Sequence, residues 1–298
     1  MRNLNRLLSE WLCGDEKITS ELVSFGGVPA IVNTEFPSDQ EEGWDGKTQF
    51  PRISYRVDRQ ADYKRSTSGM LRIAIYTLSM QVDASERIEN AIRDRLSNVV
   101  MHPDDSPAFC VSWRQTTPYE IDRRGMLVLM KEVAFDILEY PAQVTVSPDP
   151  ALSLCMFLKR IAPEAFLVSY DHQDGVYEPT DSNPAVYVRL SSLGKLEETY
   201  ALLLCTCQLE LHVLAPTAEG RLLWVRALYD ELFKQGEIPT EDGHPLKIRE
   251  INANIGADYL TSGQLTLRCT FYMLSARVRP EGTELLNHPY FDGKDLGG

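Results

Sequence analysis

The segment DHQDGVYEPTD brings four carboxylates close together in the chain: Asp171, Asp174, Glu178 and Asp181. Carboxylates are the ligands that calcium prefers, but these four do not follow the spacing of an EF-hand loop. A solvated loop is the usual setting of such a run. We therefore predict no metal site here. One alternative is an enzyme whose active site is assembled from dispersed residues such as Asp171, His172 and Asp174.

Other residue types that carry chemistry are present without the spacing that chemistry needs. The chain has no P-loop, no G-x-S-x-G and no H-E-x-x-H motif. Two of its five histidines, His102 and His244, lie in turn-like contexts that favour surface positions. Cys205 and Cys207 would share one face of a strand, but no second cysteine or histidine pair completes a zinc site. We predict buried thiols in a reducing compartment, no metal, no cofactor and no enzymatic activity.

The composition is that of an ordinary globular protein. The 298 residues are 43% hydrophobic and 24% charged, a length that suggests two domains. The formal net charge of -13 disfavours stable DNA binding, although it is compatible with a wall past which DNA slides without adhering. The N-terminal residues lack the features of a signal peptide, and no apolar run is long enough to cross a membrane.

Hydrophobic periodicity divides the first half into a helix, three strands, a second helix and two strands. Leu4, Leu7, Leu8 and Trp11 fall on one helical face, whereas the strands alternate apolar with other residues. The predicted elements are the helix 4–12, the strands 28–34, 52–58 and 70–79, the helix 84–98, and the strands 108–115 and 125–138.

The second half repeats this order. Its predicted elements are the helix 152–161, the strands 165–171, 184–193 and 201–215, the helix 218–236, and the strands 246–255 and 263–278. We therefore predict an α+β fold made of two tandem copies of a small α-β-β-β-α-β-β domain, each with a mainly antiparallel sheet packed by helices. The predicted copies span residues 1–141 and 150–280, joined by a linker at 142–149 and followed by a C-terminal tail at 281–298.

The duplication is also indicated at single positions. Pro51 and Pro184 open corresponding strands. In the long helices, Ile88, Ala91, Ile92 and Leu96 are matched to Val225, Leu228, Tyr229 and Phe233. In the last strands, Gly125, Leu127, Leu129, Val133 and Phe135 are matched to Gly263, Leu265, Leu267, Phe271 and Met273.

The first half resembles the tail-terminator and tail-completion proteins of tailed bacteriophages. The resemblance rests on the N-terminal helix followed by FPRISYRVD, GMLRIAIYTLS, SERIENAIRDRL and GMLVLMKEVAFDIL, in that order, over most of residues 1–141. The second half looks like a more diverged copy. The resemblance implies a structural virion protein without catalytic residues. It would form a ring at the phage neck that caps the tail tube and joins it to the head connector.

The same resemblance implies the partners. These are further copies of the chain, the tail tube protein, and a head connector or adaptor protein. The ring would be a hexamer, or a trimer with pseudo-sixfold symmetry, assembled in the host cytoplasm, with DNA passing through its lumen without specific binding. The alternative function is a monomeric two-domain adaptor that binds a protein or peptide.

Candidate interface residues lie in the hairpin loops between the second and third strands and in the tail. The loop of the first copy is basic, with Arg59, Lys64 and Arg65 around Tyr63. The loop of the second copy carries Lys195 beside Glu197 and Glu198. Opposite charges on two such loops would favour assembly. In the tail, Tyr290 and Phe291 are predicted to dock on a neighbouring chain.

Overall fold

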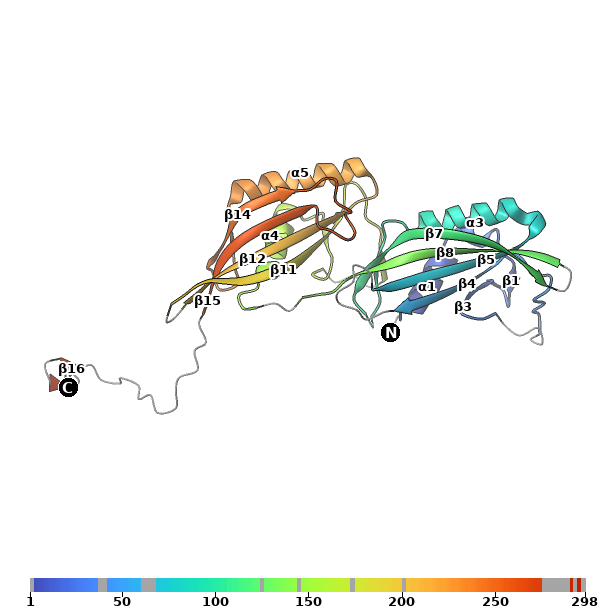
Figure 1. Cartoon of the computed structure of the whole chain (residues 1–298), viewed down its shortest axis with the longest axis horizontal. Coiled ribbons are helices and arrows are strands. Elements are labelled where there is room, and N and C mark those ends of the chain that lie inside the picture. Colours follow the sequence, from blue (N-terminus) through green and yellow to red (C-terminus); the bar gives the residue numbers. More distant parts are fainter. Residues whose placement is uncertain are drawn as a thin grey trace.

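Two curled sheets, each covered by helices on one face, make up the part of the chain that a computed structural model describes (Figure 1). The described residues are 3–36, 42–59, 68–104, 106–123, 126–143, 146–171, 175–199, 202–274, 290–291 and 294–295. The predicted α+β class, with two similar halves, is confirmed.

The first copy begins with helices and ends with a long hairpin. Its helical elements are α1 (Leu4–Cys13), α2 (Glu16–Thr19), the short 3-10 helix η1 (Ser79–Gln81) and α3 (Val82–Leu96). Its strands are β1 (Ser24–Phe25), β2 (Val28–Pro29), β3 (Ile31–Asn33), β4 (Arg52–Arg59), β5 (Gly69–Leu78), β6 (Val100–His102), β7 (Ala108–Arg123) and β8 (Met126–Tyr140).

The second copy follows the same plan. Its helices are α4 (Pro150–Ile161) and α5 (Ala218–Gln235). Its strands are β9 (Phe166–Leu167), β10 (Gly175–Tyr177), β11 (Ala185–Glu198), β12 (Leu202–Leu214), β13 (Glu237–Pro239), β14 (Pro245–Ala253) and β15 (Leu265–Leu274). Two short strands in the tail, β16 (Tyr290–Phe291) and β17 (Lys294–Asp295), pair with each other.

Apart from β10 at one edge of the first sheet, the strand orders of the two sheets correspond one to one. The first sheet has the order β10-β6-β7-β8-β5-β4-β3, and the second has β13-β14-β15-β12-β11-β9. In both, the last pair is parallel, β3 with β4 and β9 with β11, and the other pairs are antiparallel. Two unrelated domains would not share order and strand direction at every step, so the duplication extends to topology.

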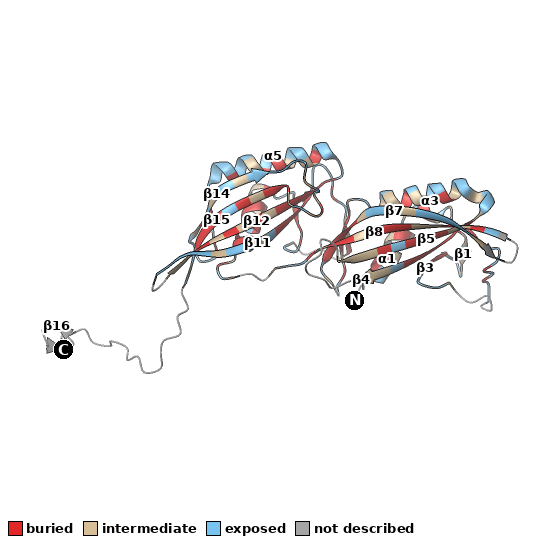
Figure 2. Cartoon of the chain, viewed as in Figure 1, coloured by how far each residue is buried: buried red, intermediate tan, exposed pale blue. Residues whose placement is uncertain are grey.

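Each copy has its own core between the sheet and its helices. In the first copy, leucines of α1 and the apolar face of α3 pack on Ile53, Ile73 and Phe135. In the second, α4 and α5 pack on inward residues that include Leu209 and Leu267. The opposite face of each sheet, here called the outer face, carries no helix, and exposed residues alternate there with buried ones (Figure 2).

Strand register shows which positions are equivalent. From the two prolines, Ile53 corresponds to Val186, and both strands begin with the same burial pattern. Ile53 lies opposite Ile75, and Val186 lies opposite Val213. Two residues back along β5 and β12, the cross-strand partners are Val133 and Leu265.

Leu265 therefore takes the place of Val133, and the predicted match of Leu265 with Leu127 is wrong by six residues. The hairpins differ in length between the copies, and a hairpin insertion shifts every later match. Gly125 lies outside the described residues. Gly263 has its own reason to be glycine, because a Cβ there would lie 3.0 Å from the Cβ of Glu210.

The helix match also needs one correction. Phe233, matched to the buried Leu96, is 70% exposed, and its neighbour Leu232 is fully buried instead. The apolar residues of α5 do not keep to one face, because Leu222 and Leu223 are exposed as well. Periodicity alone therefore could not show which of them faces the sheet.

The two copies are joined by a strand that crosses between them. β10 belongs to the second copy in sequence, yet it pairs with β6 at the edge of the first sheet. Val176 of β10 packs against the core of the first copy. The predicted boundaries between copies, linker and tail stay predictions, and β10 shows that the two sheets are not built from strictly separate segments.

A third apolar cluster lies between the copies. We call this cluster, together with the pairing of β6 with β10, the junction. It joins Cys110, Leu138 and Tyr140 of the first sheet to Tyr187 and Leu214 of the second, all on outer faces. Further members are Val100, Ala108, Phe166, Val168, Ala185 and Leu260. Outer-face residues that would be exposed to solvent in an isolated copy are buried here, so the junction has the character of a permanent interface.

Three tyrosine hydroxyl groups at the junction have hydrogen-bond partners. The Tyr140 hydroxyl donates to the Leu260 carbonyl at 3.2 Å, and the Tyr187 hydroxyl donates to the Pro141 carbonyl at 2.9 Å. The Tyr259 hydroxyl bonds Asn98 across the two copies. These hydroxyl groups therefore keep hydrogen-bond partners when they are buried, whereas Nε2 of the buried His212 ring has none among the described residues.

The segment after β8 is held along the edge of β11. The side chain of Gln143 accepts from the backbone N–H of Leu190 at 2.6 Å and donates to its carbonyl at 3.3 Å. One amide side chain thus pairs with the strand edge as a neighbouring strand would. The predicted linker is therefore anchored at this residue.

Protonation of His212 is expected to weaken the fold. The ring is buried at the junction beside Tyr140 and Tyr187, and its Nδ1 lies 3.1 Å from the Tyr259 carbonyl. Burial lowers the pKa of His212, partly opposed by that hydrogen bond. Below pH ~6.5 the unfolded chain binds a proton that the buried ring resists, so the free energy of unfolding falls with pH, at most about 1.4 kcal/mol per unit.

Denaturant titrations between pH 7.5 and 5 test this expectation. His212→Gln should reduce the loss of stability toward low pH, whereas His244→Gln, at an exposed turn, should leave it unchanged. Equal pH profiles for the two variants would contradict the assignment.

Candidate interaction surfaces

The basic loop of the first copy is only partly described. Arg59 ends β4, and its guanidinium lies 3.1 Å from Glu139 at the end of β8. Tyr63, Lys64 and Arg65 lie outside the described residues. Within the part of the loop that is described, the charge of Arg59 is therefore matched by a partner in its own sheet.

The prediction that Lys195, Glu197 and Glu198 lie in a loop of the second copy is wrong. Lys195, Glu197 and Glu198 belong to β11, which pairs with β12 as far as Glu198 and Leu203. Lys195 Nζ lies 2.5 Å from a carboxylate oxygen of Glu198. The strand pairing continues here through an irregularity between Lys195 and Glu197. Such a bulge breaks the alternation by which a strand is identified in sequence, so the segment resembled a loop.

The predicted tail contact remains a prediction. The backbone of Tyr290 and Phe291 forms β16, paired with Lys294 and Asp295. Their side chains lie outside what the structure describes.

The acidic segment serves local structure in the residues that are described. Asp171 accepts from Lys159 at 2.7 Å and from the Leu167 amide at 2.8 Å. Asp181 accepts from the amide and hydroxyl of Thr217, which caps the start of α5. His172 and Asp174 are not described. Among the residues that are, no group of three histidine, cysteine or acidic side chains could hold a metal ion.

The cysteines are free thiols, and five of the six are buried. Cys205 and Cys207 do share the inner face of β12, as predicted, and Cys207 lies directly opposite Cys269. Burial raises the pKa of Cys110 and of Cys155 to about 12. Such thiols stay protonated at neutral pH and are poor nucleophiles and poor metal ligands.

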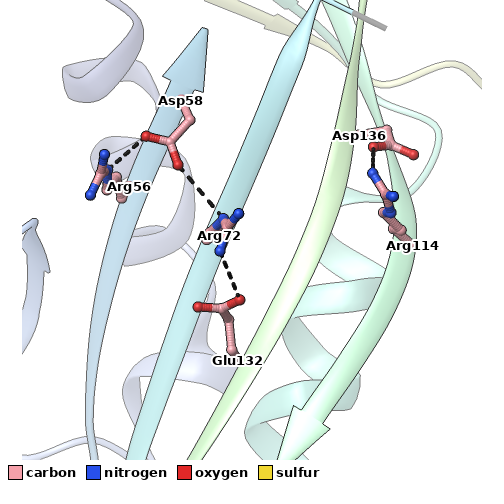
Figure 3. A network of polar contacts seen from close by, with 6 residues as sticks. All are labelled: Arg56, Asp58, Arg72, Arg114, Glu132 and Asp136. Carbon is pink, nitrogen blue, oxygen red and sulfur yellow. Dashed lines mark hydrogen bonds and ion pairs between the residues drawn. The ribbon is translucent and has the colours of Figure 1, made fainter.

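Charged side chains on the outer faces pair across neighbouring strands (Figure 3). Arg72 lies between Asp58 at 3.6 Å and Glu132 at 3.4 Å, and Asp58 also bonds Arg56 at 2.7 Å. The second sheet has similar pairs, Arg189 with Glu210 and Arg268 with Glu250, and the first has Arg114 with Asp136. Each exposed pair contributes little stability, but in each the charge of the arginine is balanced by a carboxylate.

Arg52 carries an aromatic cap that sequence reasoning missed. Its side chain is 1% exposed, and the guanidinium lies 4.3 Å from the ring centre of Phe36, 5.2 Å from Trp44 and 4.4 Å from Phe50. Cation–π attraction and burial thus hold the β3–β4 loop on the outer face of its own sheet. The signal in the sequence is an arginine that follows three aromatic residues within one long loop.

The equivalent loop of the second copy goes elsewhere. Gly43 and Gly175 both have positive φ, 83° and 91°, and lie a similar distance before Pro51 and Pro184. After Gly175 the chain crosses to the first sheet as β10, whereas after Gly43 it returns to Arg52. The same loop therefore reaches the neighbouring copy in one half and covers its own copy in the other.

The edge that would accept such a crossing strand has changed in the second copy. By register β13 corresponds to β6, the strand that pairs with β10. Pro239 in β13 has no N–H to donate. A strand added in the β10 register would also place Asp45 of another chain opposite Glu237, and like charges directly opposite are destabilising.

No family model and no curated protein matches this chain. In the described part of the chain, none of the helices has the length and apolar character needed to cross a membrane.

The buried thiols predict a clear difference in reactivity between folded and unfolded protein. With Ellman's reagent, the native protein should react rapidly at Cys13 at most, and all six cysteines should react in guanidinium. Rapid release of six equivalents from the native protein would show that the strands open easily.

The aromatic cap predicts an asymmetry between two tryptophans. Trp44→Ala should destabilise the protein by about 3 kcal/mol, because Trp44 is buried against Phe25, Phe36 and Arg52. Trp113→Ala, which removes a half-exposed ring stacked on Arg93, should cost about 1 kcal/mol. Chemical denaturation measures both, and equal losses would argue against the cap.

Proposed function

We propose that the protein is a structural subunit of a ring at the neck of a tailed bacteriophage. The ring caps the tail tube and joins it to the head connector. The observation that carries the proposal is the duplicated α+β domain. The first copy contains, in the same order along the chain, the helices and strands on which the resemblance to tail-terminator proteins rests.

Two further properties fit a conduit for DNA. The net charge of -13 repels phosphate, and the described ion pairs balance the charges on the outer faces of both sheets. A wall of this kind lets DNA pass and offers few fixed cations to bind it.

The junction favours a ring in which contacts within a chain differ from contacts between chains. A trimer with strict pseudo-sixfold symmetry would need the two kinds of contact to be alike. In such a trimer every contact between copies would resemble the junction. The aromatic cap at Arg52 and the altered β13 edge disfavour a second contact of that kind. A ring would then alternate two kinds of contact, one within chains and one between them.

The alternative is a monomeric adaptor, and one observation favours it. β9 pairs with β11 only at Ala185 and Val186, and Gln143 covers the edge near Leu190. No described strand covers the edge of β11 beyond that point, from Ser192 to Glu198. A peptide could add there as a strand.

Mass and shape in solution separate the two functions. Light scattering and negative-stain microscopy of the purified protein should show rings with a central opening. A stop mutation in the gene of the encoding phage should yield filled heads and unattached tails. A monomer at all concentrations, together with normal particles from the mutant phage, would contradict the ring and favour the adaptor.

A further inference from the structure

The two copies are related by a shift along the long axis of the chain, with their helices on the same side (Figure 1). The junction uses one end of each copy. The β7–β8 turn of the first copy and the β11–β12 hairpin of the second lie at the two outer ends of the molecule (Figure 1). If another chain were placed end to end in the same relation, these outer ends would meet.

The junction shows which positions such a contact would use. Within the chain, Tyr259 and Leu260 of the β14–β15 turn contact Asn98 and Tyr140 of the first copy. In the register that makes Leu265 equivalent to Val133, Tyr140 corresponds to Tyr272. The β14–β15 turn that carries Tyr259 corresponds to the β7–β8 turn, and Leu127 lies near the start of β8.

Exposed apolar side chains lie at the two outer ends. Leu127 is 52% exposed at the outer end of the first copy. At the outer end of the second, Tyr272 is 40% exposed and Phe233, near the C-terminus of α5, is 70% exposed. One such side chain at the first end and two at the second offer apolar surface that another molecule can cover.

We infer that chains associate end to end, with Leu127 of one chain against Tyr272 and Phe233 of the next. The partner is a second copy of this chain, because the junction already holds the equivalent pair of copies in this relation. The contact is heterologous, since different surfaces meet, and it therefore closes into a ring or continues as a filament. This inference rests on the proposed ring and names the contact between its subunits.

The contact between chains should be weaker than the junction. It lacks the crossing strand, because Arg52 holds the donor loop in its own copy and β13 is a poor acceptor. Where the junction buries Cys110 and Val100, register places the charged Lys247 and Glu237. Fewer apolar groups and more charge give a reversible contact.

Sedimentation velocity of two single variants tests the inference. The wild-type protein should sediment as rings, whereas Leu127→Glu and Phe233→Glu should each sediment mainly as monomers. The apparent Kd for association between chains should rise about ten-fold or more in each variant. Leu223→Glu is a matched control for Phe233→Glu, because Leu223 is 61% exposed and lies on the same helix, near its N-terminus and away from the proposed contact. The control should assemble as wild type.

Mixing the two variants separates a heterologous contact from a symmetric one. Each variant keeps one working end, so the mixture should form a 1:1 dimer and stop there, whereas each variant alone stays monomeric. A Leu127→Glu variant that dimerises by itself would overturn the head-to-tail arrangement.

The remaining outcomes separate this inference from the proposed function. If the wild-type protein forms rings and both variants form them equally well, the inference is overturned, whereas the proposed ring function is not. A wild-type protein that is monomeric at all concentrations would overturn both.

Discussion

The packing of one outer sheet face on another determines how the two copies are arranged. Tyr140 and Tyr187, with ring centres 4.9 Å apart, lie at the centre of the junction and both donate hydrogen bonds across it. A sheet covered by helices on one face normally leaves the other face exposed to solvent. Here part of the outer face is buried, so each copy depends on the other for the burial of its residues at the junction.

The β3–β4 loop and its counterpart show how a duplicated element can take two roles. In the second copy the loop supplies β10 to its neighbour, and Ala185 packs into the junction. In the first copy the equivalent strand position is Arg52, which holds the loop in place through its aromatic neighbours. One exchange, a small apolar residue for a long cation, thus accompanies the change from an open docking face to a closed one.

The architecture was largely predictable because alternation and helical periodicity survive wherever one face is buried. The three-residue strands β6, β10 and β13 were missed, since so short a strand leaves no pattern. Register was misjudged because it depends on hairpin length, which hydrophobicity does not encode. The continuous apolar run Ala185 to Val188 was an overlooked sign that both faces of β11 are buried.

The candidate site was less predictable than the fold. Arg59, Lys195 and Glu198 were chosen for charge, and the structure gives each a partner within the same chain. Charge along a sequence does not reveal whether a partner lies on the next strand. The positions that the structure favours instead, such as Leu127 and Phe233, stand out only because they are apolar and exposed, and exposure is a property of the fold.

The bidentate hold of Gln143 on Leu190 has an evolutionary meaning. A short tether raises the effective concentration of one copy near the other to millimolar levels, far above that of any free subunit. Each position of the pair is then always filled by the same copy. Under that guarantee of stoichiometry, the two halves were free to diverge in sequence, and the outer ends of the molecule no longer had to match the inner ones.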